Sequence, residues 1–209
     1  MGPPLGDGNT QGLLPTEVVN MALSWYTDYK KRGEQCGQVQ TLYLGHKESQ
    51  SFCDCCKSTR QDLEVSCSDP QWQTDWTSHY ITSSGFDLYA FKTAEGELVA
   101  LGAYEVRNGT MGVHVVYMES QAESNRTLVE TPKYGGIGRA LIAYGIKLSV
   151  DAGFNGDVTL DAKTPELAQH YERDFGAVRL PSRKTNAAPR YLICDEAAQM
   201  IFTDYLEEG

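Results

Sequence analysis

The stretch "KYGGIGRAL", residues 133–141, joins a glycine-rich turn to the beginning of an amphipathic helix. Gly135, Gly136 and Gly138 lie close together, and apolar residues then recur at helical spacing from Ile137 to Leu148. At a helix start, backbone N–H groups without helical partners point outward and the helix dipole is positive. The stretch therefore predicts an anion site, with a pyrophosphate as the natural group.

Two common phosphate motifs do not fit this stretch. A P-loop needs Lys and then Ser or Thr after its last glycine, whereas Gly138 is followed by Arg139 and Ala140. The dinucleotide fingerprint needs a third glycine where Leu141 stands, and it opens a parallel unit rather than following an antiparallel hairpin. A purely structural glycine turn stays open as an alternative.

The elements around the turn predict an α/β fold with a mixed sheet. Alternating stretches at 86–92, 98–106 and 111–119 predict an antiparallel meander, and Asn108-Gly109 predicts its second hairpin turn. After the turn, the pattern predicts a helix that ends at Gly153 and a strand at 157–162. A helix at 164–176, begun by Thr164 and Pro165, follows. Strands at 177–180 and 190–194 and a last helix from 195 onward complete the pattern. The strand after the first of these helices is expected to be parallel to its partner.

The N-terminal part is less regular. Residues 1–14 are expected to be a disordered tail, and 15–84 a helical, cysteine-containing region that is part of the core or packs on it; 85–209 are expected to form the core with a C-terminal helix. Within 15–84, a helix is predicted at 16–32 and a short strand at 39–44. Reduced thiols are favoured over a zinc site built on Cys53 and Cys56 with Cys36, Cys67 or His46, so no metal is predicted.

Composition narrows the class of protein. The chain has 209 residues, 41% of them hydrophobic, and a formal charge of -10, which disfavours nucleic-acid binding and attracts cations. No apolar run is long enough for a membrane helix, and the N-terminus lacks the pattern of a secretory signal. We therefore expect a cytoplasmic protein with no membrane partner.

The hexapeptide Lys133-Tyr134-Gly135-Gly136-Ile137-Gly138 resembles the hallmark of the GCN5-related N-acetyltransferase (GNAT) superfamily: Gln or Arg, two residues, Gly, one residue, then Gly or Ala. Lysine replaces the usual first residue, and the order of elements over about 85–194 is also similar. The resemblance implies a GNAT-like acyl-CoA N-acyltransferase fold that uses acetyl-CoA. It implies that the turn binds the pyrophosphate and that the preceding strand splays from its neighbour to hold the pantetheine arm. The implied cofactor-binding residues are Tyr117, Met118, Lys133, Tyr134, Gly135, Gly136, Ile137, Gly138, Arg139 and Ala140.

A second similarity lies in "ELAQHYERDFGAVRL", residues 166–180, and implies that Tyr171 is the general acid that protonates the departing thiolate. A phenol with a pKa near 10 is matched to a thiolate with a pKa near 8.5. Alternatively, Tyr171 is a core residue, because Leu167, Ala168 and Phe175 share its helical stripe. The family usually has Gly four residues after this Tyr, whereas here Gly176 follows after five.

For the general base, Glu119 is the first candidate and Glu105 the second, with a solvated strand end or a water chain as alternatives. His114 is expected to be a packing residue that alternates in phase with Val116 and Met118. The polar insert at 121–132 is longer than the family's usual connection and is expected to form a loop near the acceptor entrance.

The function expected from these patterns is acetyl transfer from acetyl-CoA to a primary amine, directly within a ternary complex. The acceptor stays open among a polyamine, an aminoglycoside-like amine, a lysine side chain and a free amino acid, and assembly as a homodimer is left open. The alternative is a non-catalytic module that binds acyl-CoA or a protein partner.

Overall fold

The computed structural model describes residues 41–44, 51–68, 72–93, 95–106, 111–181 and 187–206, all within one compact unit, Val39–Gly209. The predicted helix at 16–32 and the Asn108-Gly109 turn lie outside these residues. None of the helices in the described ranges has the length and apolar character needed to cross a membrane.

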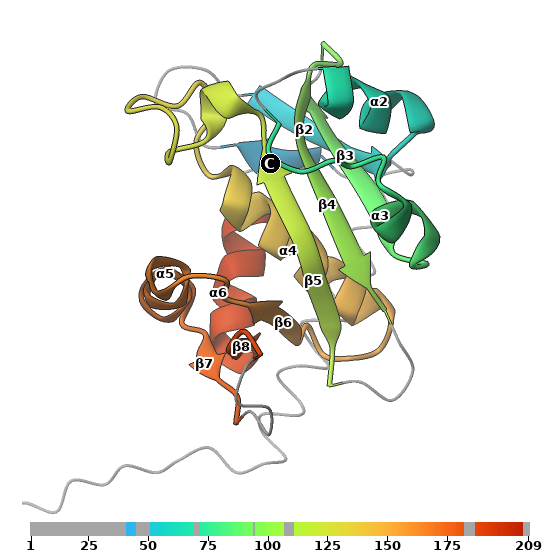
Figure 1. Cartoon of the computed structure of the whole chain (residues 1–209). Coiled ribbons are helices and arrows are strands. Elements are labelled where there is room, and N and C mark those ends of the chain that lie inside the picture. The colour runs from blue at the N-terminus through green and yellow to red at the C-terminus, as the bar shows by residue number, and fades with distance from the viewer. Residues whose placement is uncertain are drawn as a thin grey trace, which may run out of the picture. The chain divides into compact units, whose positions relative to one another are not determined.

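The described strands form one mixed sheet of eight, in the order β1-β2-β3-β4-β5-β6-β8-β7 (Figure 1). Only β5 and β6 pair in parallel, and every other neighbouring pair is antiparallel. The predicted mixed sheet is therefore confirmed. The strands are β1 Thr41–Leu44, β2 Ser51–Lys57, β3 Asp87–Thr93, β4 Leu98–Glu105, β5 Val113–Ser120, β6 Val158–Asp161, β7 Val178–Arg179 and β8 Arg190–Ile193.

Two strands from the cysteine-containing region extend this sheet. The strand predicted at 39–44 corresponds to β1, and β2 carries Cys53, Cys55 and Cys56. β2 pairs with β3, with Cys56 opposite Ala90. Residues 41–44 and 51–57 therefore belong to the same sheet as the predicted core.

Helices cover both faces of the sheet (Figure 1). Along β4, Leu101 and Ala103 pack with Trp76 and with residues of α2 and α3, whereas Tyr104 lies on the opposite face and donates a hydrogen bond to the Leu141 carbonyl of α4 at 2.7 Å. This division follows from the alternation of side chains along a strand. The helices are α2 Arg60–Ser68, α3 His79–Ser83, α4 Ile137–Asp151, α5 Pro165–Phe175 and α6 Asp195–Leu206, with a short 3-10 helix at Ala122–Ser124.

The helix that carries Tyr171 begins and ends as its sequence predicts. The Thr164 side chain accepts a hydrogen bond from the Leu167 N–H at 3.3 Å, and Pro165 occupies the first turn of α5. Gly176, with φ of 62°, ends the helix in the left-handed conformation. The departure in glycine spacing therefore coincides with an ordinary glycine stop.

The two parallel strands separate soon after they pair. β5 and β6 are in register only from Val113 to Val115 and from Val158 to Leu160. β5 continues to Ser120 and keeps its pairing with β4, so residues 116–120 have no strand partner on the β6 side among the described residues. This separation positions the candidate site.

Candidate functional site

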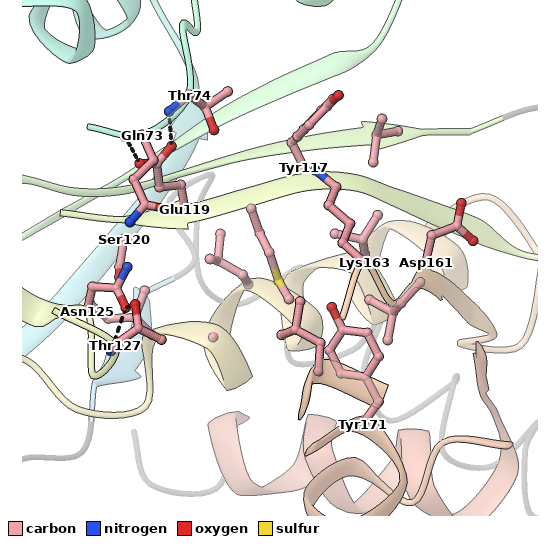
Figure 2. Close-up of a pocket in the computed structure, with 18 residues that line it drawn as sticks. Gln73, Thr74, Tyr117, Glu119, Ser120, Asn125, Thr127, Asp161, Lys163 and Tyr171 are labelled. Atoms are coloured by element: carbon pink, nitrogen blue, oxygen red, sulfur yellow. Dashed lines mark hydrogen bonds between the residues drawn. The ribbon is translucent and has the colours of Figure 1, made fainter. Parts of the chain in front are cut away.

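A cavity of about 380 Å³ lies where β5 and β6 separate. β5, the start of α4, the end of β6, and α5 supply most of its lining (Figure 2). The insert at 121–132 contributes Asn125 and Thr127, and the segment before α3 contributes Gln73 and Thr74. Residues far apart in sequence are thus brought together by one opening in the sheet.

A β-bulge sets which β5 side chains face which side. The register between β4 and β5 shifts between Ala103 and Tyr104, leaving Val116 as an extra residue on β5. As a result, Val116 and Tyr117 both pack against the core cluster of α2 and α3. The prediction that His114, Val116 and Met118 alternate in one phase is therefore wrong beyond Val116, because the bulge moves Tyr117 to the face that Met118 would have occupied.

The glycine turn brings backbone to the cavity. Gly136 caps α4 with φ of 76°, a left-handed conformation that favours glycine, and no side chain caps this helix start. Ile137 and Gly138 line the cavity. A Cβ built on Gly138 would meet no atom within 4 Å, so the space in front of this backbone is open.

The two cations of the turn are held by acids of the protein. The Lys133 ammonium lies 2.6 Å from Oε1 of Glu97. The Tyr134 hydroxyl donates a hydrogen bond to the same carboxylate at 2.9 Å. Arg139 points the other way and pairs with Asp204. Of the predicted cofactor-binding residues, Tyr117, Met118, Ile137 and Gly138 line the cavity, whereas Lys133, Tyr134, Gly135, Gly136, Arg139 and Ala140 lie outside its lining.

Tyr171 reaches the cavity from α5 with its hydroxyl pointing inward (Figure 2). Only 4% of the residue is exposed, and its ring packs against those of Phe175 and Tyr191. Burial, together with the negative charge of Asp161, raises the pKa of the Tyr171 phenol. The hydroxyl makes no hydrogen bond to the part of the chain that the structure describes, so it is open to a ligand in the cavity.

The Glu119 carboxylate lies on the opposite wall and is already hydrogen-bonded. It accepts from the backbone N–H groups of Gln73 and Thr74 at 2.5 and 3.1 Å and from the Trp76 indole N–H at 3.0 Å (Figure 2). Glu119 therefore attaches the segment before α3 to the end of β5. Its role as a base stays a prediction.

Lys163 and Asp161 also line the cavity, and sequence reasoning did not assign them to it. They stand at and just after the end of β6, the strand from which β5 separates. Polar residues at the end of a strand next to an expected opening are the signal that could have identified them. The Lys163 ammonium lies 4.3 Å from the centre of the Tyr117 ring.

A charged network lies behind these residues. Arg190 donates two hydrogen bonds to the Asp161 carboxylate at 2.7 and 2.9 Å, and His114 Nε2 lies 3.6 Å from the same group. Burial favours the protonated form of Asp161, but the hydrogen bonds and charge of Arg190 outweigh it and lower the pKa. Burial and the charge of Arg190 lower the pKa of His114, while its Nδ1 lies 3.0 Å from the Thr159 hydroxyl. His114 is thus held by its neighbours, as a packing residue would be.

Comparison with known proteins identifies the fold. No protein-family model and no curated protein matches the sequence. Among solved structures, the chain is similar to a GNAT-family acetyltransferase from Listeria monocytogenes, with a TM-score of 0.50 and 11% identity over 73% of this chain and 98% of that one. It is also similar to a GNAT-family acetyltransferase from Staphylococcus aureus, with a TM-score of 0.44 and 13% identity over 67% and 97% of the two chains. The described part of this chain therefore has the GNAT acyltransferase fold.

Proposed function

We propose that this protein transfers an acetyl group from acetyl-CoA to a primary amine. One observation carries the proposal: a single cavity is bordered by the unpaired edge of β5, the glycine start of α4 and the hydroxyl of Tyr171. The three features correspond to three requirements of the reaction, namely a binding edge for an extended arm, an anion site and a proton donor. The GNAT fold supports the same reaction class by analogy.

The glycine turn is suited to a pyrophosphate through its backbone. The open space beside Gly138 lets an anion come close to the first N–H groups of α4, and the helix dipole favours negative charge there. Since Lys133 and Arg139 are paired with acids, we assign recognition to these N–H groups rather than to the two side chains. Lys133 instead shapes the turn through Glu97.

The pantetheine arm would lie along the β5 edge that faces the opening. Between residues 116 and 120, the backbone N–H and C=O groups that point to the β6 side are available there, because β6 no longer pairs with this part of β5. The β-bulge at Val116 lies at the start of this edge and re-aims the strand beside the opening. Recognition by backbone groups makes this part of the site tolerant of side-chain identity.

Acetyl-CoA supplies an activated thioester, and the protein's residues must position the amine and deliver a proton to the departing sulfur. Tyr171 is suited to that delivery because its hydroxyl points into the cavity and a phenol is protonated at neutral pH. The described lining of this cavity has no cysteine, which supports direct transfer within a ternary complex. For Glu119, whose carboxylate already accepts three hydrogen bonds, we propose a positioning role in place of the base.

The test compares Tyr171→Phe with Tyr191→Phe, which makes the same change in a tyrosine packed against Tyr171 but outside the cavity lining. Acetyl-CoA binding is measured by thermal shift, and turnover by thiol release with a panel of amines. We expect Tyr171→Phe to keep binding and to lower kcat by about 10²- to 10⁴-fold, while Tyr191→Phe keeps both. Unchanged turnover of Tyr171→Phe would remove its assigned role. Binding without turnover in the unmodified protein would instead favour a non-catalytic module.

A further inference from the structure

We propose that the acceptor is an α-amino acid with a large apolar or aromatic side chain, whose carboxylate binds Lys163. This inference rests on the proposed acetyl transfer and concerns a second cavity, of about 550 Å³, on the α3 side of β5. The second cavity shares four lining residues with the first: Val116, Tyr117, Asp161 and Lys163. The two cavities therefore adjoin at these four residues, and the proposal places the reacting amine there.

The β-bulge helps to build this junction. Without an extra residue at Val116, strand alternation would direct Val116 and Tyr117 to opposite faces of the sheet. With it, both side chains pack on the α2 and α3 side, and both line the two cavities. The β-bulge at Val116 thus places two residues where they border both the first cavity and the second cavity.

One wall of the second cavity is aromatic. Tyr80 contacts Phe86 and Tyr117 edge to face, with ring centres 5.9 and 6.3 Å apart. Tyr80 is 59% exposed, so part of its ring is accessible to a ligand. Such a wall suits an apolar or aromatic body, since aromatic side chains offer a large contact area at low entropic cost.

Lys163 is the cation of this cavity that is open to a ligand. Arg190 is paired with Asp161 through its Nε and Nη2 atoms. The other described lysines each have a carboxylate oxygen 2.6–2.8 Å from Nζ; they are Lys57, Lys92, Lys133 and Lys147. Within the described ranges, Lys163 has no such partner and instead lies over the Tyr117 ring. An ammonium at the edge of a cavity without an acid of its own favours an anionic ligand group.

The position of Lys163 also fixes where that anion lies on the acceptor. Because Lys163 lines both cavities, a carboxylate bound to it lies at the junction, beside the point that the reacting amine must reach. An α-amino acid has its carboxylate one carbon away from its amine. Glu105 also lines the second cavity, and its negative charge attracts the ammonium form of an incoming amine.

The experiment measures how much the carboxylate of the acceptor contributes, apart from its amine and its aromatic body. L-Phenylalanine and phenethylamine share the amine and the aromatic body, and only the first has a carboxylate. With saturating acetyl-CoA, kcat/KM is measured for L-phenylalanine, phenethylamine and spermidine. Each is measured in the unmodified protein, in Lys163→Met and in Lys57→Met. Lys57→Met is the matched control, since Lys57 also lies over a tyrosine ring, that of Tyr89, but outside both cavities.

We expect the unmodified protein and Lys57→Met to prefer L-phenylalanine by about 10- to 100-fold, the range of a charge-assisted hydrogen bond. Lys163→Met should lose this preference through a lower kcat/KM for L-phenylalanine alone. An equal loss for both amines, a raised KM for acetyl-CoA only, or faster transfer to phenethylamine or spermidine overturns the inference. So does stabilisation by acetyl-CoA without release of the CoA thiol in the presence of L-phenylalanine, phenethylamine or spermidine. The absence of both stabilisation and thiol release would remove the proposed function itself.

Discussion

Glu97, in the turn between β3 and β4, holds the ammonium of Lys133 at 2.6 Å, just before the glycine turn. This pairing lowers the pKa of Glu97 and raises that of Lys133. The same carboxylate accepts hydrogen bonds from Tyr134 at 2.9 Å and from Gln121 at 3.3 Å. Glu97 therefore joins both ends of the 121–132 insert to a hairpin that is remote in sequence.

Glu97→Gln should loosen this attachment, because an amide accepts fewer hydrogen bonds and cannot pair with Lys133. We expect Tm to fall by about 2–4 °C and the affinity for acetyl-CoA to fall about threefold as the turn becomes less ordered. Differential scanning fluorimetry with and without acetyl-CoA measures both. Glu95→Gln is the control, since Glu95 is exposed two residues away. Equal behaviour of the two variants would contradict the attachment.

Gly138→Ala should stabilise the folded protein but weaken its binding of acetyl-CoA. Alanine replaces glycine in the first turn of α4, which should add up to about 0.5 kcal/mol to the free energy of unfolding. Its methyl group points into the open space proposed for the pyrophosphate, so acetyl-CoA should bind more weakly, by about tenfold or more. Urea unfolding and a binding titration test the two effects.

The control for that substitution is Gly145→Ala on the same helix, where the added methyl group would lie 3.2 Å from the Tyr104 ring. This crowding should offset the gain in stability and leave acetyl-CoA binding unchanged, because Gly145 does not line the cavity. A Gly138→Ala protein that binds acetyl-CoA as tightly as the unmodified protein would argue against the pyrophosphate position.

Glu119→Ala distinguishes a positioning role from a role as base. Loss of the carboxylate leaves the backbone N–H groups of Gln73 and Thr74 and the buried indole of Trp76 without their acceptor. We expect the free energy of unfolding to fall by about 1–3 kcal/mol, with kcat falling less than tenfold once the variant is folded. A large fall in kcat at unchanged stability, restored by raising the pH, would support a base instead.

Asp157→Asn should stabilise the protein at neutral pH. Burial and the negative charge of Asp195 raise the pKa of Asp157 to about 6. A raised pKa means that the folded state favours the protonated carboxyl, so its stabilising contribution is present below about pH 4 and is lost as the pH rises through about 6. We expect a gain of about 1–2 kcal/mol at pH 7.5 that disappears at pH 4, measured by urea unfolding across this range. A gain independent of pH would exclude titration of Asp157 as its cause.

The sequence predicted those parts of the fold that depend on local patterns. Alternation identified β3, β4 and β5, and Thr164 with Pro165 identified the start of α5, because capping and strand periodicity act over a few residues. The bulge at Val116 escaped prediction, since it depends on how β5 pairs with β4 rather than on the residue itself. It reversed the expected facing of the residues that follow.

Long-range pairing explains the other differences at the site. The turn sequence shows that Lys133 is a cation but not that Glu97 neutralises it from a distant hairpin. Likewise, nothing near Glu119 in the sequence indicates that Trp76 donates to it. Lys163 and Tyr80 come together at the second cavity only through the order of strands and helices. The partners of these side chains therefore could not be predicted from the residues next to them in the sequence.

The separation of β5 from β6 leaves the sheet incomplete in its middle rather than at its margin. An exposed row of backbone donors and acceptors normally invites strands from other molecules and leads to aggregation. Here the row faces a cavity of about 380 Å³ that α4 and α5 border. This space suits a narrow ligand rather than a strand of another molecule. Residues 116–120 thus present an internal edge, bordered by α4 and α5, in place of the open outer edge at which a sheet usually adds strands.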